Sequence, residues 1–179
     1  KTRPRQITIV SLARAGTPIG ALLARALRTL GRNDVCHYSI SIIRDRGIDQ
    51  NALKFILRRE QREPAGLAFV DGWTAKGVIA GELRCALHDW NASQFEQLDE
   101  SLHVVSDIGG VADIAATDDD YAIPSGILNA TVSGLTSRSI LNDTISQTDF
   151  HGCVFYEQFR RHDHSRWFLD QVAAYFNNV

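Results

Sequence analysis

Up to Ile108 the chain alternates between short apolar runs and segments whose apolar side chains recur at a helical period. The short runs are rich in β-branched residues and predict buried strands at residues 7–13, 36–43, 66–70 and 102–108. Spacings of three and four between apolar residues predict helices over residues 18–31, 51–60 and 78–90. Strands that alternate with helices through short connections form parallel sheets, so the predicted class is α/β, a parallel sheet flanked by helices on both faces.

The two longer predicted helices each have one apolar face. This face comprises Ile19, Leu22, Leu23, Ala26, Leu27 and Leu30 on the first helix, and Ile79, Leu83, Ala86, Leu87 and Trp90 on the second. For the strand at residues 36–43 the sequence does not decide which side chains face the core. They are either Tyr38, Ile40 and Ile42 or the complementary residues.

Beyond Gly109 the periodic pattern weakens, and Gly, Ser, Thr, Asn and Asp become frequent. We predict a short helix near residues 132–141, a last strand at 152–156 and a closing helix over 165–176. The sequence contains no repeat, low-complexity tract or clear linker, so residues 1–179 are expected to form one domain. Because the chain opens on KTRPRQ without an initiator methionine, we expect this domain to be a fragment of a longer protein.

Composition narrows the class of protein. The chain is 44% hydrophobic and 22% charged, as soluble globular domains are, and its net charge of -2 provides no overall field that would attract RNA or an anionic membrane. No apolar run approaches the roughly 20 residues that span a bilayer, and no secretory signal pattern is present. The three cysteines are widely spaced without a CxxC pair, which favours a reducing compartment. We expect a cytoplasmic domain.

The loop after the third predicted strand is a candidate phosphate-binding site. Asp71 stands at the end of the strand, and a short glycine-containing loop then leads directly into a helix. A helix N-terminus offers free backbone N–H groups to a phosphate, glycine allows close approach, and lysine adds positive charge. The alternative is a plain turn with a solvated lysine and a capping aspartate. The candidate phosphate-binding residues are Thr74, Ala75, Lys76 and Gly77.

The first two predicted strands end in similar loops. After the first come small residues around one arginine, a backbone cradle that suits pyrophosphate, at Ala13, Arg14, Ala15 and Gly16. After the second come Arg44 and Arg46, whose alternative interpretation is a solvated cluster paired with Asp45 and Asp49. The carboxyl ends of parallel strands meet at one edge of a sheet, where ligands bind in such folds. Three basic loops at that edge therefore favour one shared anion site.

Four segments together resemble a known family. FVDGWTAKGVI resembles the phosphoribosyl-diphosphate (PRPP) loop of type I phosphoribosyltransferases, and VSLARAGTPIGALLARAL resembles their pyrophosphate loop. With HYSISIIRDRGID and PSGILNATVSGLTSRSIL, the set is similar to the phosphoribosyltransferase-like proteins of bacterial tellurite-resistance (ter) operons, also known as the cysteine protease StiP family. The similarity runs over nearly the whole chain. It implies the type I phosphoribosyltransferase-like fold with a small hood from the C-terminal half, in a stress-response protein that can form a homodimer.

The resemblance also implies roles for the strand-end residues. Asp71 would contact the ribose hydroxyls, directly or as a ligand of Mg²⁺. Asp71, Arg44 and Arg46 would form the catalytic set, in which the two arginines fold over the leaving group. Residues 74–77 would hold the 5′-phosphate, and residues 13–16 the pyrophosphate, in a loop of a kind that can carry a non-proline cis peptide. A base-like acceptor would lie under the hood, and the candidate hood residues are Ser125, Asn129, Ser133 and Arg138. The implied activity is transfer of the phosphoribosyl group of PRPP or a nucleotide to or from that acceptor.

One departure from the family pattern keeps other functions open. Type I enzymes usually carry two adjacent acidic residues at the strand end, whereas here Gly72 and Trp73 follow Asp71. This leaves room for an altered sugar ligand, for a non-catalytic PRPP- or nucleotide-binding regulatory module, or for a scaffold without PRPP affinity. Relatives also carry an RNA-binding Pelota-like domain that has no counterpart in this chain, which again indicates a fragment.

The sequence does not favour protease chemistry. A cysteine protease needs a thiolate near a histidine and a group that orients the histidine. Cys36 lies at the start of a predicted strand, Cys85 inside a helix and Cys153 at the start of a strand-like run. We expect each of them to be a small buried apolar residue rather than a nucleophile.

Overall fold

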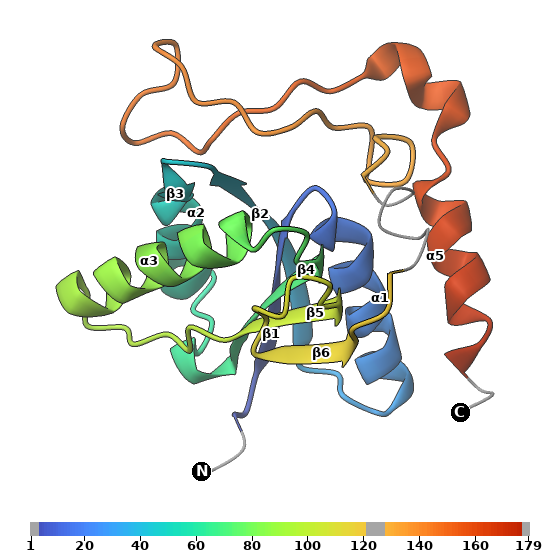
Figure 1. The fold of residues 1–179 in the computed structure, drawn as a ribbon, viewed down its shortest axis with the longest axis horizontal. Helices are drawn as coiled ribbons and strands as arrows, with labels where there is room; N and C mark the ends of the chain where they lie inside the picture. The colour runs from blue at the N-terminus through green and yellow to red at the C-terminus, as the bar shows by residue number, and fades with distance from the viewer. Residues whose placement is uncertain (1–3, 121–127, 177–179) are drawn as a thin grey trace.

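The computed structural model describes residues 4–120 and 128–176 (Figure 1). The strands are β1 (Ile7–Ala13), β2 (Val35–Ile43), β3 (Gly47–Ile48), β4 (Leu67–Trp73), β5 (Leu102–Ser106) and β6 (Ile114–Thr117). The α-helices are α1 (Gly16–Thr29), α2 (Gln50–Lys54), α3 (Val78–Ser93) and α5 (Ser165–Ala173). A π-helical segment, Phe55–Arg59, continues α2, and 3-10 turns form at Pro64–Gly66 and Glu157–His162.

The strands form one six-stranded sheet in the order β3-β2-β1-β4-β5-β6. All pairs are parallel except β2 with β3, so the predicted α/β class with a parallel sheet is confirmed. In this order β1 lies between β2 and β4, and the carboxyl ends of these three strands are neighbours. The sequence pattern missed β3, which has only two residues, and β6, most of whose residues are exposed.

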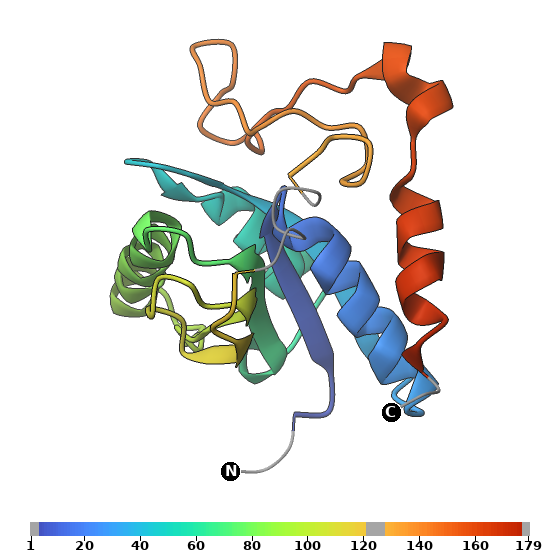
Figure 2. The same cartoon turned by 45° about the vertical axis from the view of Figure 1, so that its right-hand side comes forward.

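Helices cover both faces of the sheet, with α1 and α5 on one side and α2 and α3 on the other (Figures 1 and 2). The larger apolar cluster joins the sheet to α2 and α3, and the smaller one joins it to α1. Ile40 and Ile42 belong to the larger cluster, with Tyr38 packed against it, which decides the orientation of β2. None of the helices in the described ranges combines the length and apolar character that crossing a bilayer requires.

The predicted face of α1 is only partly correct. Ile19 and Leu22 are buried, but Leu23 is 41% exposed and Leu30 80% exposed. Small residues, including Gly20 and Ala24, are buried instead. The helix approaches the strands closely there, since a Cβ atom at Gly20 would lie 2.8 Å from the Cβ atom of Ser11. On α5, Phe168 packs against the α1-side cluster, whereas Tyr175 lies beyond the helix and is exposed.

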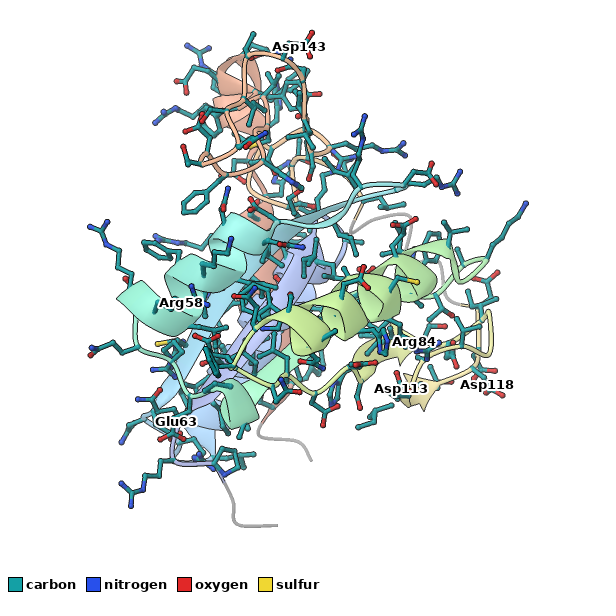
Figure 3. All side chains as sticks on the ribbon, turned by 90° about the vertical axis from the view of Figure 1, so that its left-hand side faces the viewer. Arg58, Glu63, Arg84, Asp113, Asp118 and Asp143 are labelled. Carbon is teal, nitrogen blue, oxygen red and sulfur yellow. The ribbon has the colours of Figure 1, made fainter. Side chains whose placement is uncertain are left out.

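Residues 128–156 form an extended arm that crosses above the carboxyl ends of the strands (Figures 1 and 2). The predicted helix at 132–141 and the predicted strand at 152–156 are both wrong, because this segment contains turns and two isolated bridges, Thr136 with Phe155 and Ile140 with Gly152. Side chains bond the backbone locally, as Ser133 Oγ does to the Asn129 carbonyl at 3.0 Å, and such bonds compete with helix formation. Figure 3 shows Asp143 at the outer tip of this arm.

Candidate functional site

A cavity of about 510 Å³ lies where the loops after β1, β2 and β4 meet the arm. It contains residues from each of the three predicted strand-end loops, although these loops are far apart in the sequence. The arm closes it from above with Leu128, Arg138 and Ser139. The other lining residues are Ala13, Arg14, Ala15, Ile42, Ile43, Arg44, Asp71, Trp73 and Ile79.

A second cavity, of about 320 Å³, adjoins the first along the loop between β4 and α3. Residues 74–80 line it, and it shares Arg44, Asp71, Trp73 and Ile79 with the larger cavity. The two cavities therefore have a common wall and lie side by side in the space beyond the carboxyl ends of the strands. Among the described residues that line both cavities, Trp73 is the one with an aromatic side chain.

Asp71 is the buried acid of this space. It lies inside β4, which runs on to Trp73 rather than ending at Val70 as predicted, and its exposed fraction is 8%. Burial raises the pKa of Asp71 to about 7, although backbone N–H groups of Gly72 and Gly16 favour the charged form. The bond from the Gly72 N–H to Oδ1 measures 2.7 Å. Near neutral pH this carboxyl group can therefore both hold a proton and accept one from a bound hydroxyl.

Arg14 connects the β1 loop to the arm. Its Nη1 donates a hydrogen bond of 3.2 Å to the Thr136 carbonyl, and its Nε is buried without a hydrogen-bond partner among the described residues. A buried donor is normally satisfied, so an acceptor group supplied by a ligand would suit this position. The peptide bond between Ala13 and Arg14 is cis, as the resemblance implied for this loop.

The two arginines of the β2 loop differ in position. Both are exposed, but Arg44 lines the two cavities and Arg46 lines neither. In the described residues no ion pair joins either arginine to Asp45 or Asp49, so the self-paired cluster considered from sequence does not form. Arg44 is therefore free to contact an anion in the cavity.

The β4–α3 loop leads into a helix of 16 residues. Ala75, Lys76 and Gly77 line the smaller cavity, and Lys76 is exposed. No side chain caps the N-terminus of α3, so its first N–H groups remain available to an anion. Thr74 is different, because its side chain is 5% exposed and its hydroxyl donates to Asp107 Oδ1 at 2.6 Å.

The predicted hood residues lie at several depths. Arg138 is exposed and lines the larger cavity. Ser133 is buried and bonded to the Asn129 carbonyl, and Asn129 accepts a bond from the Thr131 N–H, so these two residues shape the arm without lining either cavity. Ser125 lies outside the described residues. Sequence reasoning missed Ser139, which carries no local signal for a ligand site.

The cysteines are placed differently from expectation. Cys85 and Cys153 are exposed, not buried, and neither belongs to the two apolar clusters. Cys36 is half-buried. None of the three lines either cavity, and no described histidine hydrogen-bonds to any of them.

Ser11 and His37 form a serine–histidine pair away from the cavities. The Ser11 hydroxyl and His37 Nε2 lie 2.7 Å apart, and Ser11 is fully buried beneath α1. Burial, with a smaller contribution from the positive charge of Arg28, lowers the pKa of His37 to about 4. Because the Ser11 hydroxyl is fully buried, this pair is a packing contact rather than a candidate for nucleophilic catalysis.

Comparisons with known proteins complete the description of the site. The family model for the "Tellurite-like stress resistance cysteine protease StiP" matches residues 1–173. A "Cysteine protease StiP" of Acinetobacter baylyi is 45% identical over 175 residues, which cover 93% of this chain and 44% of that protein, so the chain spans less than half of this relative. A variant hypoxanthine phosphoribosyltransferase from Trypanosoma cruzi, complexed with its product IMP, aligns over 97% of this chain and 79% of its own. The sequence identity is 14% and the TM-score is 0.42, so the structural likeness is low.

Proposed function

This chain belongs to the StiP family of tellurite-like stress resistance proteins, and we propose that it binds PRPP or a nucleotide with Mg²⁺ and transfers the phosphoribosyl group to or from a base-like acceptor. The observation that carries this proposal is the space at the strand ends, where two adjoining cavities lie between three loops and the arm. Its two cavities, about 510 and 320 Å³, are of the size that small-molecule ligands occupy in proteins.

The charges around this space favour a polyanion. Among the described lining residues the cationic side chains are Arg14, Arg44, Lys76 and Arg138, and the one acidic side chain is Asp71. Guanidinium groups bind phosphate oxygens through paired, charge-assisted hydrogen bonds. A ligand with two phosphate groups would balance this excess of positive charge.

The geometry suggests where each part of PRPP would bind. The 5′-phosphate would occupy the smaller cavity, against Lys76 and the N-terminus of α3. The ribose would lie over Asp71, which lines both cavities, and the pyrophosphate over Arg14 and Arg44 in the larger one. The acceptor would lie beneath Arg138, where the arm closes the space.

Mg²⁺ is compatible with this arrangement. Asp71 is a carboxylate in the shared wall, while no group of three His, Cys, Asp or Glu side chains in the described ranges could hold a metal ion alone. Protein Mg²⁺ sites commonly use one or two carboxylates together with phosphate oxygens and waters. When bound, the ion would offset negative charge on the pyrophosphate.

The proposed reaction breaks the bond between ribose C1 and the pyrophosphate oxygen, and the electron pair leaves with pyrophosphate. A nitrogen of the acceptor base then bonds to C1, and its proton passes to a base or to solvent. Arg14 and Arg44 would stabilise the charge that develops on the leaving group, and the cavity walls would align the acceptor with C1.

A second candidate is a regulatory module that binds PRPP or a nucleotide without turnover in a stress or tellurite-resistance system. The observation in its favour is that Asp71 is followed by Gly72, so the site has one carboxylate where two would be expected. Protease activity is not proposed for this part of the chain, because the three cysteines have no histidine partner among the described residues and lie away from both cavities.

Isothermal titration calorimetry with PRPP and Mg²⁺ tests the proposal. We expect micromolar binding by the wild type, and a loss of at least about tenfold in Lys76→Ala and Asp71→Asn. Lys54→Ala is the matched control, since Lys54 lies on α2 and lines neither cavity. Absence of heat up to millimolar PRPP would exclude the transferase and the PRPP-binding module alike.

A turnover assay then separates the two candidates. Release of pyrophosphate from PRPP is measured in the presence of a panel of purine and pyrimidine bases. Base-dependent release that Arg14→Ala abolishes would support the transferase. Tight PRPP binding without release for any base would favour the regulatory module.

A further inference from the structure

Asp107 follows β5 and lines neither cavity, yet its carboxylate contacts the loop that leads into α3. Its Oδ1 accepts a hydrogen bond of 2.6 Å from the Thr74 hydroxyl. The same oxygen accepts bonds from the N–H groups of Val111 and Ala112, at 2.9 and 3.1 Å. These bonds, the one from Thr74 foremost, hold the pKa of Asp107 below its usual value, so the carboxylate is charged at neutral pH.

Thr74 is fully engaged inside the protein. Its hydroxyl donates to Asp107 and accepts a bond of 2.9 Å from the Gly109 N–H, and its own N–H donates to the Ser106 carbonyl at 3.2 Å. Both donors of Thr74 are therefore used by the polypeptide. Thr74 shapes the loop, and the contacts with a phosphate fall to the residues that follow it.

The loop after β5 also touches the 74–77 loop through its backbone. A Cβ atom at Gly109 would lie 2.6 Å from the Ala75 carbonyl oxygen and 2.9 Å from that of Thr74. Only glycine permits this approach, because a side chain would force the two loops apart. The path of residues 74–77 is thus defined by residues more than thirty positions later in the chain.

The loop that carries Asp107 is itself held firmly. Arg84 on α3 donates to the Val111 carbonyl and forms an ion pair of 3.2 Å with Asp113 (Figure 3). Asp113 also accepts a bond of 2.9 Å from the Leu102 N–H at the start of β5. Asp107 therefore acts from a support that is fixed to both α3 and the sheet.

We propose that Asp107 is a positioning residue for phosphate binding: through Thr74 it holds the loop in the conformation that places Ala75, Lys76 and Gly77 around the smaller cavity. The inference rests on the proposed function and deepens it. Asp107 lines neither cavity, and Thr74, through which it acts, lines only the smaller one, so its effect should be confined to the subsite of the 5′-phosphate. The subsite of the pyrophosphate, built by residues 13–16, is independent of it.

The test uses two probes that report on the two subsites separately. Ribose 5-phosphate and inorganic pyrophosphate are titrated by calorimetry into the wild type, Asp107→Asn, Thr74→Val and Thr74→Ser. We expect Asp107→Asn and Thr74→Val to bind ribose 5-phosphate about tenfold more weakly and pyrophosphate within about twofold of the wild type. Thr74→Ser keeps the hydroxyl and should restore the affinity. Asp118→Asn, at an exposed carboxylate just after β6 that lines neither cavity, is the matched control and should leave both affinities unchanged.

Hydrogen exchange provides a second readout that needs no ligand. In Asp107→Asn we expect faster amide exchange in residues 72–80 and unchanged exchange in residues 12–20. Equal loss of both affinities, or unchanged exchange in residues 72–80, would overturn the positioning role. If the wild type binds neither probe, the proposed function is overturned and this role with it. If the wild type binds both probes and Asp107→Asn binds them equally well, this role alone is overturned.

Discussion

The Asp49 carboxylate holds the backbone of His151 through a hydrogen bond of 2.7 Å from the His151 N–H to Oδ2. Its other oxygen accepts a bond of 3.0 Å from the Ala52 N–H and so caps α2. The His151 ring adds a bond of 2.8 Å between Nδ1 and the Ser41 hydroxyl. One carboxylate, 3% exposed, thus fixes the start of α2 and the arm that closes the larger cavity.

Replacement of Asp49 should loosen the arm. Asp49→Ala removes the cap of α2 and the bond to His151, and it leaves two partly buried N–H groups without their acceptor. We therefore expect the free energy of unfolding to fall by about 2 kcal/mol. Limited proteolysis should cut the variant within residues 142–150 faster than the wild type. Asp143→Ala, at the exposed tip of the arm, is the control and should change neither property (Figure 3). Equal cleavage of Asp49→Ala and the wild type would show that other contacts hold the arm.

Gly16 permits the close approach of α1 to β4. A Cβ atom at position 16 would lie 2.6 Å from the Val70 carbonyl oxygen and 3.1 Å from the Cα of Asp71. Gly16→Ala should therefore lower the free energy of unfolding by about 1–3 kcal/mol, because the helix must move away from the strand. Gly81→Ala, in α3 with open space around it, should instead stabilise by about 0.5–1 kcal/mol. Urea denaturation measures both, and equal effects of the two substitutions would contradict the steric argument.

Ionisation of Asp71 should make the protein less stable as the pH rises. The pKa of Asp71 is raised from 3.8 to about 7 in the folded state, so the unfolded chain loses this proton first. The resulting loss of unfolding free energy, up to about 4 kcal/mol, develops between about pH 4 and pH 7. Asp71→Asn removes this contribution. The free energies of unfolding of the variant at pH 5 and pH 8 should therefore differ less than those of the wild type. An identical pH dependence in the variant and the wild type would show that Asp71 titrates normally.

His37 should act in the opposite direction. Its pKa is lowered from 6.5 to about 4 in the folded state, so the stability associated with neutral His37 is present above about pH 6.5 and is lost as the pH falls toward 4. His37→Gln keeps a hydrogen-bonding partner for Ser11 without the titration. Chemical denaturation at pH 7 and pH 5 should show a smaller acid loss for this variant than for the wild type. An unchanged acid loss would place the responsible group elsewhere.

The sequence predicted secondary structure correctly where its apolar residues form a clear run or a regular pattern. The strand predicted at residues 7–13 coincides with β1, and α3 includes the whole of the predicted helix at 78–90. β1 buries the continuous run of residues 8–12, and α3 presents apolar residues to the core at a helical period. Where that signal is absent the prediction failed: most of β6 is exposed, and in the arm local bonds from side chains such as Ser133 replace helical hydrogen bonds.

By itself the sequence determined the parallel sheet and the arrangement of basic loops at neighbouring strand ends, because both follow from the local order of apolar runs and loop residues. Only the tertiary structure decided which of these loop residues line the cavities. Arg44 lines the cavities and Arg46 does not, although the two are separated by a single residue. Thr74 is engaged by Asp107, and Arg138 reaches the cavity on an arm held by Asp49. These outcomes depend on contacts between residues that are distant in the chain, and no local pattern encodes them.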